Sequence, residues 1–410
     1  MSIKAIKTAV IGSGMISWTY LKNMTECFGI LDVVGCSDII PERSAGRAKE
    51  FGIRQMTNDE ILKDPNIKIV VNLTYPSAHF DVTKMCIEAG KHVHTEKAIA
   101  NSYAEAKSLI DLATSKGLRI SCAPDTFLGG PYQTARKAID DGWIGKPICA
   151  MATLVRGYRN DGVTPLPFNR PGGMWVAGNS MPYDMGGYYL HALVHLLGPI
   201  NRVGGFGMAC GQPYVNPKNE NYGKPFPATA DTSITAALEF KNGILGTLVV
   251  LGECYGEVPR IEIYGTEGTL ICPDPNTYNG PVLIGRHGSD ELRELPILHD
   301  YNTFGKNDEV FKAELAKTAV GPNATFEENF PRMYFGSRRG LGVADLAWAI
   351  TNNRPHRCAA ELGLHHLEVV EGVAESNKKD IIYRLKSCPA QPAPLPSGFI
   401  GGAAEKALDN

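Results

Sequence analysis

The chain has 410 residues, a formal net charge of −2 and a hydrophobic fraction of 43%. A chain of this length exceeds what one hydrophobic core supports, and its apolar content excludes an intrinsically disordered protein. The nearly balanced charge argues against nucleic acid and anionic membranes as partners. No apolar run reaches the ~20 residues that span a bilayer.

Ten cysteines are scattered along the chain without a Cys-x-x-Cys pair. Their spacing favours neither a metal cluster nor a disulfide framework. The first residues lead directly into an apolar run, without the features of a signal peptide. We therefore expect a cytoplasmic protein with reduced thiols.

The N-terminal part of the chain alternates between strand-like and helix-like patterns. Asn101-Ser102 and Asn58-Asp59 are helix-cap signals, and Gly90 and Gly117 are stop signals. Such alternation predicts an α/β fold, a parallel sheet with helices on both faces. The expected strands are Thr8–Ile11, Asp32–Cys36, Lys68–Leu73, His92–Thr95 and Arg119–Cys122. The expected helices are Ile16–Phe28, Pro41–Phe51, Ser77–Ala89 and Ser102–Lys116.

A glycine-rich turn joins the first expected strand to the first expected helix. Gly12 permits a tight turn, and Gly14 lets the backbone approach a pyrophosphate. The N–H groups of Met15 and Ile16 would face that pyrophosphate at the helix N-terminus. Ser17 replaces the third glycine of the usual fingerprint but is small enough for close packing. The turn predicts a dinucleotide site; an ordinary βα turn without a nucleotide is the alternative.

An acidic residue, Asp38, ends the second expected strand. A carboxylate there accepts hydrogen bonds from the adenosine ribose hydroxyls and repels a 2′-phosphate, which favours NAD over NADP. Arg43 lies close by in sequence and is the kind of residue that accommodates that phosphate, so NADP stays open.

Beyond Cys122 the pattern changes to closely spaced β-rich runs. Turn signals such as Lys241-Asn242-Gly243 separate them, which predicts a largely antiparallel sheet. The expected strands are Ile148–Arg156, Val203–Met208, Thr232–Phe240, Ile244–Leu251, Arg260–Tyr264 and Thr269–Ile271. The expected helices are Tyr132–Asp141, Tyr183–Leu197, Val343–Thr351 and Glu361–Ser376. The Pro-rich tail from Cys388 is typical of an extended arm.

Several motifs occur in the order found in one enzyme family. They are Gly12-x-Gly14, Asp38-x-x-Pro41-Glu42-Arg43, Pro76-x-x-His79, Ala89-Gly90-Lys91-His92-Val93 and Glu96-Lys97. In this order the chain resembles the Gfo/Idh/MocA family of sugar and polyol oxidoreductases, from about Thr8 to about Glu375. The resemblance implies an N-terminal Rossmann domain and a C-terminal α/β domain with a large open, mainly antiparallel sheet. Such sheets commonly form a subunit interface, so we expect a homo-oligomer.

This organisation gives three expected segments. An NAD-binding domain covers residues 1–124, a substrate-binding and oligomerisation domain covers 125–387, and the Pro-rich arm covers 388–410.

Glu96-Lys97-Ala98 stands where the family has Glu-Lys-Pro. The resemblance places Lys97 beside the nicotinamide, where it would hold the reacting hydroxyl and stabilise a developing alkoxide. It also implies cofactor roles for Thr74, Glu96 and His79, although His79 would serve equally to cap its helix. Without the proline, a cis peptide bond between Lys97 and Ala98 is not expected. The alternative for Lys97 is a surface lysine without a catalytic role.

The family's second signature, Asp-x-x-x-His with a frequent later Asp, appears here as Asp184, Tyr188 and His191. On one continuous helix these positions are i, i+4 and i+7 and share a face. An imidazole has a pKa of about 6.5, so His191 is our first choice as the base that takes the alcohol proton. A desolvated Lys97, or Tyr188 beside a cation, would serve instead. Asp184 would orient a hydroxyl or one of these groups.

The residues that follow His191 are apolar, so a satisfied core histidine is the alternative there. His191 and His195 have the spacing of metal ligands, but no third ligand is evident. We therefore expect no metal site.

Substrate-binding residues are expected mainly between residues 156 and 183, where aromatic and polar side chains stand among Gly and Pro. Aromatic faces pack on sugar C–H surfaces and polar groups bind hydroxyls. A solvated loop is the alternative. Asp125 would face the same cleft by its place in the family. The expected substrate residues are Asp125, Arg156, Tyr158, Trp175, Tyr183, Asp184 and His191.

Two segments, 122–130 and 184–190, resemble a branch of the family that lacks the usual His and acts on glycosides, including C-glucosides. The resemblance implies an NAD-dependent dehydrogenase that converts a secondary hydroxyl of a sugar or glycoside, by preference the C3 hydroxyl of a glucoside, to a keto-sugar. Two other functions stay open. One is an NAD-dependent glycosidase that uses transient C3 oxidation and elimination, and the other is a non-catalytic dinucleotide sensor.

Overall fold

A computed structural model describes residues 4–155, 178–209, 222–224, 228, 230–252, 254, 256, 258–289, 291–298 and 337–396. The chain divides into two compact units. Unit 1 draws on the described parts of Met1–Gly130, Leu298–Gly363 and Pro392–Asn410, and unit 2 on those of Pro131–Ile297 and Leu364–Gln391. Unit 1 thus includes chain segments far beyond residue 124, and the expected domain bounds stay a prediction.

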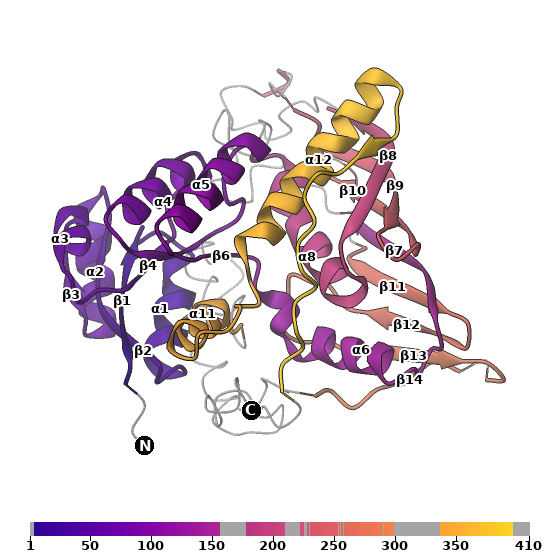
Figure 1. The fold of residues 1–410 in the computed structure, drawn as a ribbon, viewed down its shortest axis with the longest axis horizontal. Helices are drawn as coiled ribbons and strands as arrows, with labels where there is room; N and C mark the ends of the chain where they lie inside the picture. Colours follow the sequence, from indigo (N-terminus) through magenta and orange to yellow (C-terminus); the bar gives the residue numbers. More distant parts are fainter. Residues whose placement is uncertain are drawn as a thin grey trace. The chain divides into compact units, whose positions relative to one another are not determined.

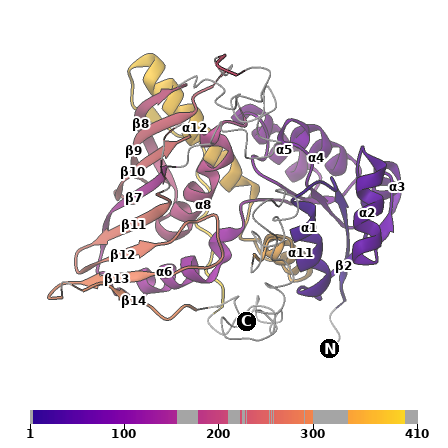
Figure 2. The ribbon, with the colours of Figure 1, turned by 180° about the vertical axis from the view of Figure 1, so that it is seen from behind.

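Among the described residues, unit 1 contains a parallel sheet of order β3-β2-β1-β4-β5-β6. The central β4 is buried along its whole length, as a strand covered on both faces must be. Helices α4 and α5 cover one face, and α1 and α11 lie on the other (Figures 1 and 2). The strands are β1 (Ile6–Ile11), β2 (Leu31–Ser37), β3 (Arg54–Gln55), β4 (Ile69–Asn72), β5 (His92–Thr95) and β6 (Ile120–Cys122). The helices are α1 (Ser17–Glu26), α2 (Pro41–Phe51), α3 (Asn58–Lys63), η1 (Pro76–Ala78), α4 (His79–Glu88), α5 (Tyr103–Ser115), η2 (Thr126–Leu128) and α11 (Leu341–Thr351).

The helix caps of unit 1 follow the sequence with one exception. Ser102 caps α5, because its Oγ accepts the Glu105 N–H at 3.3 Å. The expected cap Asn58-Asp59 is wrong. Thr57 caps α3 instead, since its Oγ1 accepts the Glu60 N–H while the Glu60 carboxylate accepts the Thr57 N–H. This reciprocal pair satisfies two backbone donors at once.

Helix α11 is held at both ends by charged side chains of unit 1. The Asp125 carboxylate accepts the N–H groups of Gly340 and Gly342 at 3.1 and 2.9 Å. At the other end, Arg119 Nη1 donates to the Ala349 carbonyl at 2.9 Å. A carboxylate at the N-terminus and a guanidinium at the C-terminus complement the helix dipole and satisfy backbone groups that the helix leaves unpaired.

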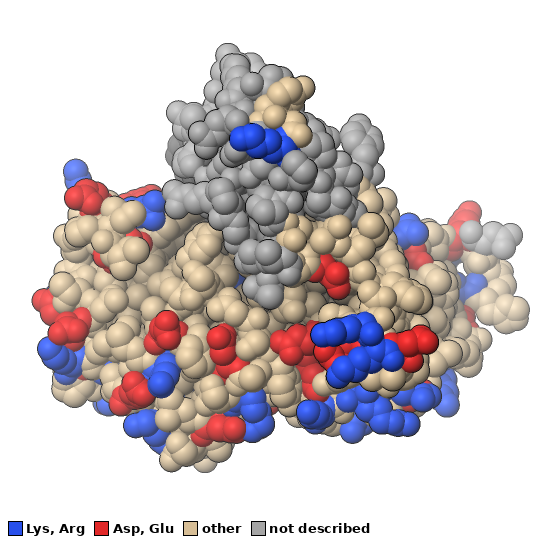
Figure 3. Space-filling view, turned by 90° about the horizontal axis from the view of Figure 1, so that it is seen from above, with Lys and Arg blue, Asp and Glu red and all other residues tan. Residues whose placement is uncertain are grey.

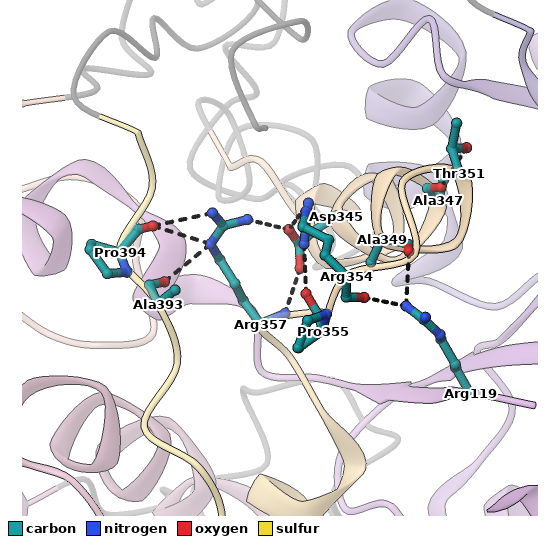
Figure 4. Close-up of polar contacts among 10 residues, drawn as sticks. All are labelled: Arg119, Asp345, Ala347, Ala349, Thr351, Arg354, Pro355, Arg357, Ala393 and Pro394. Carbon is teal, nitrogen blue, oxygen red and sulfur yellow. Dashed lines mark hydrogen bonds and ion pairs between the residues drawn. The ribbon is translucent and has the colours of Figure 1, made fainter. Parts of the chain in front are cut away.

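A buried ion-pair cluster joins α11 to the segment at residues 393–394 (Figure 4). The fully buried Asp345 carboxylate accepts hydrogen bonds from Arg357 Nη1 at 2.6 Å and Arg354 Nη2 at 2.8 Å. Arg357 Nε donates onward to the carbonyls of Ala393 and Pro394 at 3.1 and 3.3 Å. One carboxylate and one guanidinium therefore fix part of the expected C-terminal arm to unit 1.

The described part of unit 2 contains a mixed sheet of order β14-β13-β12-β11-β7-β10-β9-β8-β15. The expectation of a largely antiparallel sheet is confirmed, and the β7–β10 pair is parallel. The strands are β7 (Pro147–Val155), β8 (Ile200–Met208), β9 (Ser233–Phe240), β10 (Leu245–Leu251), β11 (Arg260–Gly265), β12 (Gly268–Cys272), β13 (Leu283–Arg286), β14 (Arg293–Glu294) and β15 (Tyr383–Arg384). The helices are α6 (Gly130–Asp140), α7 (Met181–Asp184), α8 (Gly186–Leu197) and α12 (Ala360–Lys379), whose first residues belong to unit 1.

The two faces of the second sheet differ in burial. Helices α6, α8 and α12 lie on one side of it (Figures 1 and 2). Burial alternates along β9 and β10, as it does when one face packs and the other faces outward. Met151, Leu245 and Phe206 are exposed by 43%, 56% and 72%, so the outward face carries apolar side chains.

The expected single helix Tyr183–Leu197 is wrong, because the structure has two helices there. Helix α7 ends at Asp184 and α8 begins at Gly186, with Met185 between them. Glycine is a poor helix former, and Gly186-Gly187 follow the break directly. Asp184 therefore lies on a different helix from Tyr188 and His191.

Two histidines, His365 buried and His92 half-buried, make the stability of the fold depend on pH. Burial lowers the pKa of His365 in unit 2 to about 4, and its Nε2 accepts the Ile200 N–H at 3.0 Å. Burial and the neighbouring Arg119 lower the pKa of His92 in unit 1 to about 4, and its Nδ1 accepts the Arg119 N–H at 3.0 Å. A nitrogen that accepts a hydrogen bond cannot be protonated without breaking that bond.

We expect the urea midpoint to be highest above about pH 6.5, the ordinary histidine pKa, and to fall as the pH drops towards 4. In that window the unfolded chain binds protons that the folded chain excludes. For His365 alone the loss is on the order of 3 kcal/mol, at about 1.4 kcal/mol per pKa unit. A His365→Gln variant should show a shallower dependence than the wild type. A midpoint that stays constant between pH 7 and 5 would contradict this expectation.

Charges of both signs are interspersed over the described surface in Figure 3. Several form exposed i, i+4 pairs, such as Lys63 with Asp59 at 2.7 Å. Within the described ranges, none of the helices combines the length and apolar character that a bilayer crossing requires.

Candidate active site

The sequence-predicted cofactor residues of unit 1 gather at the carboxyl edge of the parallel sheet. The glycine-rich turn follows β1, Asp38 follows β2, Thr74 follows β4, and Glu96 with Lys97 follows β5. These four strands are adjacent in the order β2-β1-β4-β5. The strand order reverses between β1 and β4, and ligands of open α/β sheets bind at such a switch point.

The turn after β1 fits a dinucleotide. Gly12 has φ of +100°, and a Cβ there would lie 2.5 Å from the Leu73 carbonyl carbon, so only glycine is tolerated. A Cβ on Gly14 would meet no heavy atom within 4 Å, which leaves open space over the turn. Helix α1 begins without a side-chain cap, so its first N–H groups, near Met15 and Ile16, suit a pyrophosphate.

The Asp38 carboxylate braces this turn. Its two oxygens accept the Ser13 N–H at 2.7 Å and the Ile40 N–H at 2.8 Å. Each oxygen keeps further acceptor capacity for a ribose hydroxyl. Arg43 is exposed on α2 within a few residues of this carboxylate. The arrangement thus provides both an acidic group for a ribose and a nearby cation.

His79 is buried and joins two loops of the edge. Its Nδ1 lies 2.7 Å from the Ala98 carbonyl oxygen and its Nε2 lies 3.0 Å from the Thr74 carbonyl oxygen. Burial lowers its pKa, although the two carbonyls and Glu96 oppose this effect. The His79 ring therefore links the loop that follows β4 to the loop that follows β5.

Glu96 is buried and Lys97 is partly exposed at the end of β5. Glu96 Oε1 accepts the Tyr20 hydroxyl at 2.8 Å, and Oε2 accepts the Lys97 N–H at 3.1 Å. Burial alone would raise the pKa of Glu96, but the charges of Arg339 and Lys97, with these hydrogen bonds, bring it below its ordinary value. The Lys97–Ala98 peptide is cis, so the expectation of a trans bond is wrong.

In unit 2, Tyr188 and His191 are neighbours on α8, three residues apart. Asp184 ends α7 and so lies on the preceding helix. His191 is buried, and its ring meets that of His366 edge-on with centroids 6.4 Å apart. His366 Nε2 lies 3.0 Å from the Pro182 carbonyl oxygen.

Burial, together with Glu371 and Asp231, raises the pKa of Tyr183. His195 contacts Gln133, with Nε2 at 3.2 Å from the amide nitrogen.

Of the expected substrate residues, three lie in a part of the chain that the structure does not describe, and a fourth is buried. Arg156, Tyr158 and Trp175 lie outside the described residues. Asp125 is fully buried in unit 1, where it caps α11. Its expected substrate contact stays a prediction.

Sequence reasoning missed the residues packed around Glu96. Tyr20 of α1, His94 of β5 and Arg339 before α11 all belong to unit 1. Arg339 is more than 200 positions away in the chain, and a single sequence carries no signal for such a pairing. The expected helix Ile16–Phe28 includes Tyr20, but its pattern carries no signal for the partner of the Tyr20 hydroxyl.

The fold and the glycine-rich turn together define a dinucleotide-binding protein. A model of the oxidoreductase family with NAD-binding Rossmann fold, GFO_IDH_MocA, matches residues 6–123, and a model of the GFO/IDH/MocA C-terminal domain matches residues 132–271. The chain therefore belongs to the Gfo/Idh/MocA family of oxidoreductases. The resemblance found in its motifs is confirmed.

Named relatives include sugar and polyol dehydrogenases. The chain is 28% identical over 271 residues to scyllo-inositol 2-dehydrogenase (NAD(+)) of Bacillus subtilis, covering 65% of this chain and 73% of that protein. It is 25% identical over 244 residues to levoglucosan dehydrogenase of Pseudarthrobacter phenanthrenivorans, covering 56% and 62%. A solved levoglucosan dehydrogenase in complex with NADH and levoglucosan has a TM-score of 0.71 at 18% identity, covering 93% and 100%. This last likeness establishes the fold.

Proposed function

We propose that this protein is an NAD-dependent dehydrogenase that oxidises a secondary hydroxyl of a sugar or glycoside to a ketone, by preference the C3 hydroxyl of a glucoside. The observation that carries the proposal is Lys97, which follows β5 at the same sheet edge as the glycine-rich turn and Asp38. Family membership and the names of the relatives, which act on inositols and levoglucosan, support the substrate class. The preference for C3 rests on the resemblance to the glycoside branch.

The cofactor residues divide by the part of the dinucleotide that each would hold. The N–H groups near Met15 and Ile16 would bind the pyrophosphate, and Asp38 would bind the adenosine ribose. Thr74, Glu96 and the loops that His79 joins would border the nicotinamide half. When bound, the nicotinamide supplies the hydride acceptor.

The chain's own residues would manage the proton and the developing charge. Lys97 would bind the reacting hydroxyl and stabilise the alkoxide while the carbon loses hydride. His191 would take the hydroxyl proton, with Lys97 or Tyr188 as the other candidates. Asp184 would orient a hydroxyl of the substrate.

Cofactor preference should depend on the charge of Asp38. The Asp38→Asn variant keeps an acceptor oxygen for the Ser13 N–H but loses the charge that repels a 2′-phosphate. We expect its NAD-over-NADP ratio of kcat/KM to fall by about tenfold, or about 1.4 kcal/mol. Asp32→Asn, an exposed residue at the opposite end of β2, is the matched control. An unchanged ratio in Asp38→Asn would refute the proposed role of this carboxylate.

The proposed reaction is tested by assaying purified protein against a panel of sugars, polyols and glycosides. NADH absorbance and keto-product are followed together, after mass spectrometry of any small molecule released on denaturation. Stoichiometric NADH and keto-sugar are expected. Release of aglycone without net NADH would indicate the glycosidase instead, and NAD binding without turnover of any compound would indicate the sensor.

The open face of the second sheet also supports a homo-oligomer. Exposed Met151, Leu245 and Phe206 lie on its outward face and would be covered by a second copy. Light scattering coupled to gel filtration should therefore give a mass above that of the monomer. Every described cysteine is free, which supports action in the reducing cytoplasm.

A further inference from the structure

A tyrosine hydroxyl connects α1 to the backbone of Lys97 through one buried carboxylate. Tyr20 is fully buried, and its Oη–H donates to Glu96 Oε1 at 2.8 Å. The other oxygen of Glu96 accepts the Lys97 N–H at 3.1 Å. Two hydrogen bonds to the Glu96 carboxylate therefore link α1 to the backbone of Lys97, the proposed catalytic residue.

The Glu96 carboxylate is ionised at neutral pH, because its pKa lies below its ordinary value. An ionised carboxylate only accepts hydrogen bonds, so Tyr20 must donate to it. Arg339 and Lys97 supply the positive charges that offset the burial of Glu96 and keep its pKa low. Burial lowers the pKa of the neighbouring His94, although Asp125 and Glu96 oppose this effect.

The surroundings hold Tyr20 in place. His94 Nε2 lies 3.5 Å from Tyr20 Oη, and His94 Nδ1 lies 2.9 Å from Ser121 Oγ. Three residues along α1 from Tyr20, the Asn23 amide donates to the Arg339 carbonyl at 2.9 Å. One helix thus carries both the hydroxyl that binds Glu96 and the amide that fixes the segment bearing Arg339.

We propose that Tyr20 is a positioning residue for Lys97, which it holds in its reactive placement by fixing the Glu96 carboxylate. The inference rests on the proposed function, in which Lys97 binds the reacting hydroxyl. Without the tyrosine hydroxyl, Glu96 Oε1 loses its closest donor and the carboxylate is free to turn. The Lys97 backbone then loses a fixed acceptor, and a shift of about 1 Å at a catalytic group costs up to about a hundredfold in rate.

The test compares two Tyr→Phe variants that each delete one buried hydroxyl. Tyr20→Phe should lower kcat at least about tenfold while the substrate KM and the NAD dissociation constant stay within about twofold. The control is Tyr132→Phe in unit 2, where a fully buried hydroxyl donates to the Pro273 carbonyl at 2.6 Å. It should lose similar thermal stability and keep the wild-type kcat. Equal kcat in the two variants would overturn the inference.

A double-mutant cycle checks that Tyr20 acts through Glu96. If it does, the kcat of Tyr20→Phe/Glu96→Gln should match that of Glu96→Gln alone, because the second change removes the charge that the hydroxyl positions. Independent, multiplicative losses would overturn the inference, since they would mean that the two residues act separately.

A readout without turnover separates this inference from the proposed function. Acylation of Lys97 by an amine-reactive ester is followed by mass spectrometry of its peptide, with exposed Lys84 as the internal reference. The ratio of Lys97 to Lys84 labelling should change in Tyr20→Phe and not in Tyr132→Phe. If the wild type oxidised no substrate, the proposed function would fail; an unchanged ratio would overturn the positioning role whatever the assay shows.

Discussion

Replacing Lys97 by methionine should lower kcat by about a hundred- to ten-thousandfold, the range that a proton-transfer or charge-stabilising group contributes. Methionine has a similar length and is apolar, so the variant removes the ammonium with little change in packing. The fold should persist, because Lys97 is partly exposed while its neighbour Glu96 carries the buried contacts. Steady-state kinetics on the best substrate of the panel would measure the loss.

The controls separate loss of chemistry from loss of binding. NADH binding, followed by fluorescence, should be within a few-fold of wild type in Lys97→Met. Lys97→Arg should also be impaired, because arginine keeps the charge but does not release a proton near neutral pH. Lys84→Met, which removes an exposed lysine on α4, should behave as wild type. A Lys97→Met enzyme with kcat within about threefold of wild type would exclude the lysine from the chemistry and favour His191 or Tyr188 alone.

The regular elements of both sheets were predictable because their signals are local. Buried parallel strands are continuous apolar runs, as in β4, and half-buried strands alternate, as in β10. Very short strands were missed. β3, β14 and β15 have two residues each. Such segments are defined by the neighbour they pair with rather than by their own pattern.

The shared sheet edge of the expected cofactor residues was predictable from their position in the fold. Once β1, β2, β4 and β5 are recognised, the residues that follow them must share one edge. The partners of those residues were not predictable. Asp125 caps α11, and Arg339 reaches the surroundings of Glu96 from a distant part of the chain. Both outcomes depend on where α11 packs, which no local pattern specifies.

The α7–α8 region shows how one residue pair changes a site prediction. A continuous helix would align Asp184 with Tyr188 and His191, but the Gly186-Gly187 pair follows a break. His366 then lies against both helices, through the Pro182 carbonyl and the His191 ring. Residue His366 of α12 therefore contacts the helices on both sides of the break.

Replacing Asp345 by alanine should destabilise unit 1 by about 3–5 kcal/mol, the cost of leaving a buried charge without its partner. The carboxylate is fully buried and binds Arg357 through both the backbone N–H and Nη1, each at 2.6 Å. Burial would raise the pKa of Asp345, but Arg357 and Arg354 keep it below its ordinary value. Removing the carboxylate leaves Arg357 desolvated and loosens its hold on Ala393 and Pro394. Urea unfolding and hydrogen exchange of α11 peptides would measure the effect.

Two comparisons decide whether the loss comes from burial of an unpaired charge. Asp111→Ala breaks an exposed pair with Lys107 on α5, at 2.5 Å, and should cost less than about 1 kcal/mol. The double variant Asp345→Leu/Arg357→Met removes both buried charges and should recover part of the loss, since well-packed apolar side chains can replace a buried ion pair. Residues 393–394 should nevertheless exchange faster in the double variant, because they lose the guanidinium that binds their carbonyls. If the double variant is less stable than Asp345→Ala, the attraction between the charges of the cluster exceeds the cost of burying them. The attachment of residues 393–394 would then depend on that attraction as well.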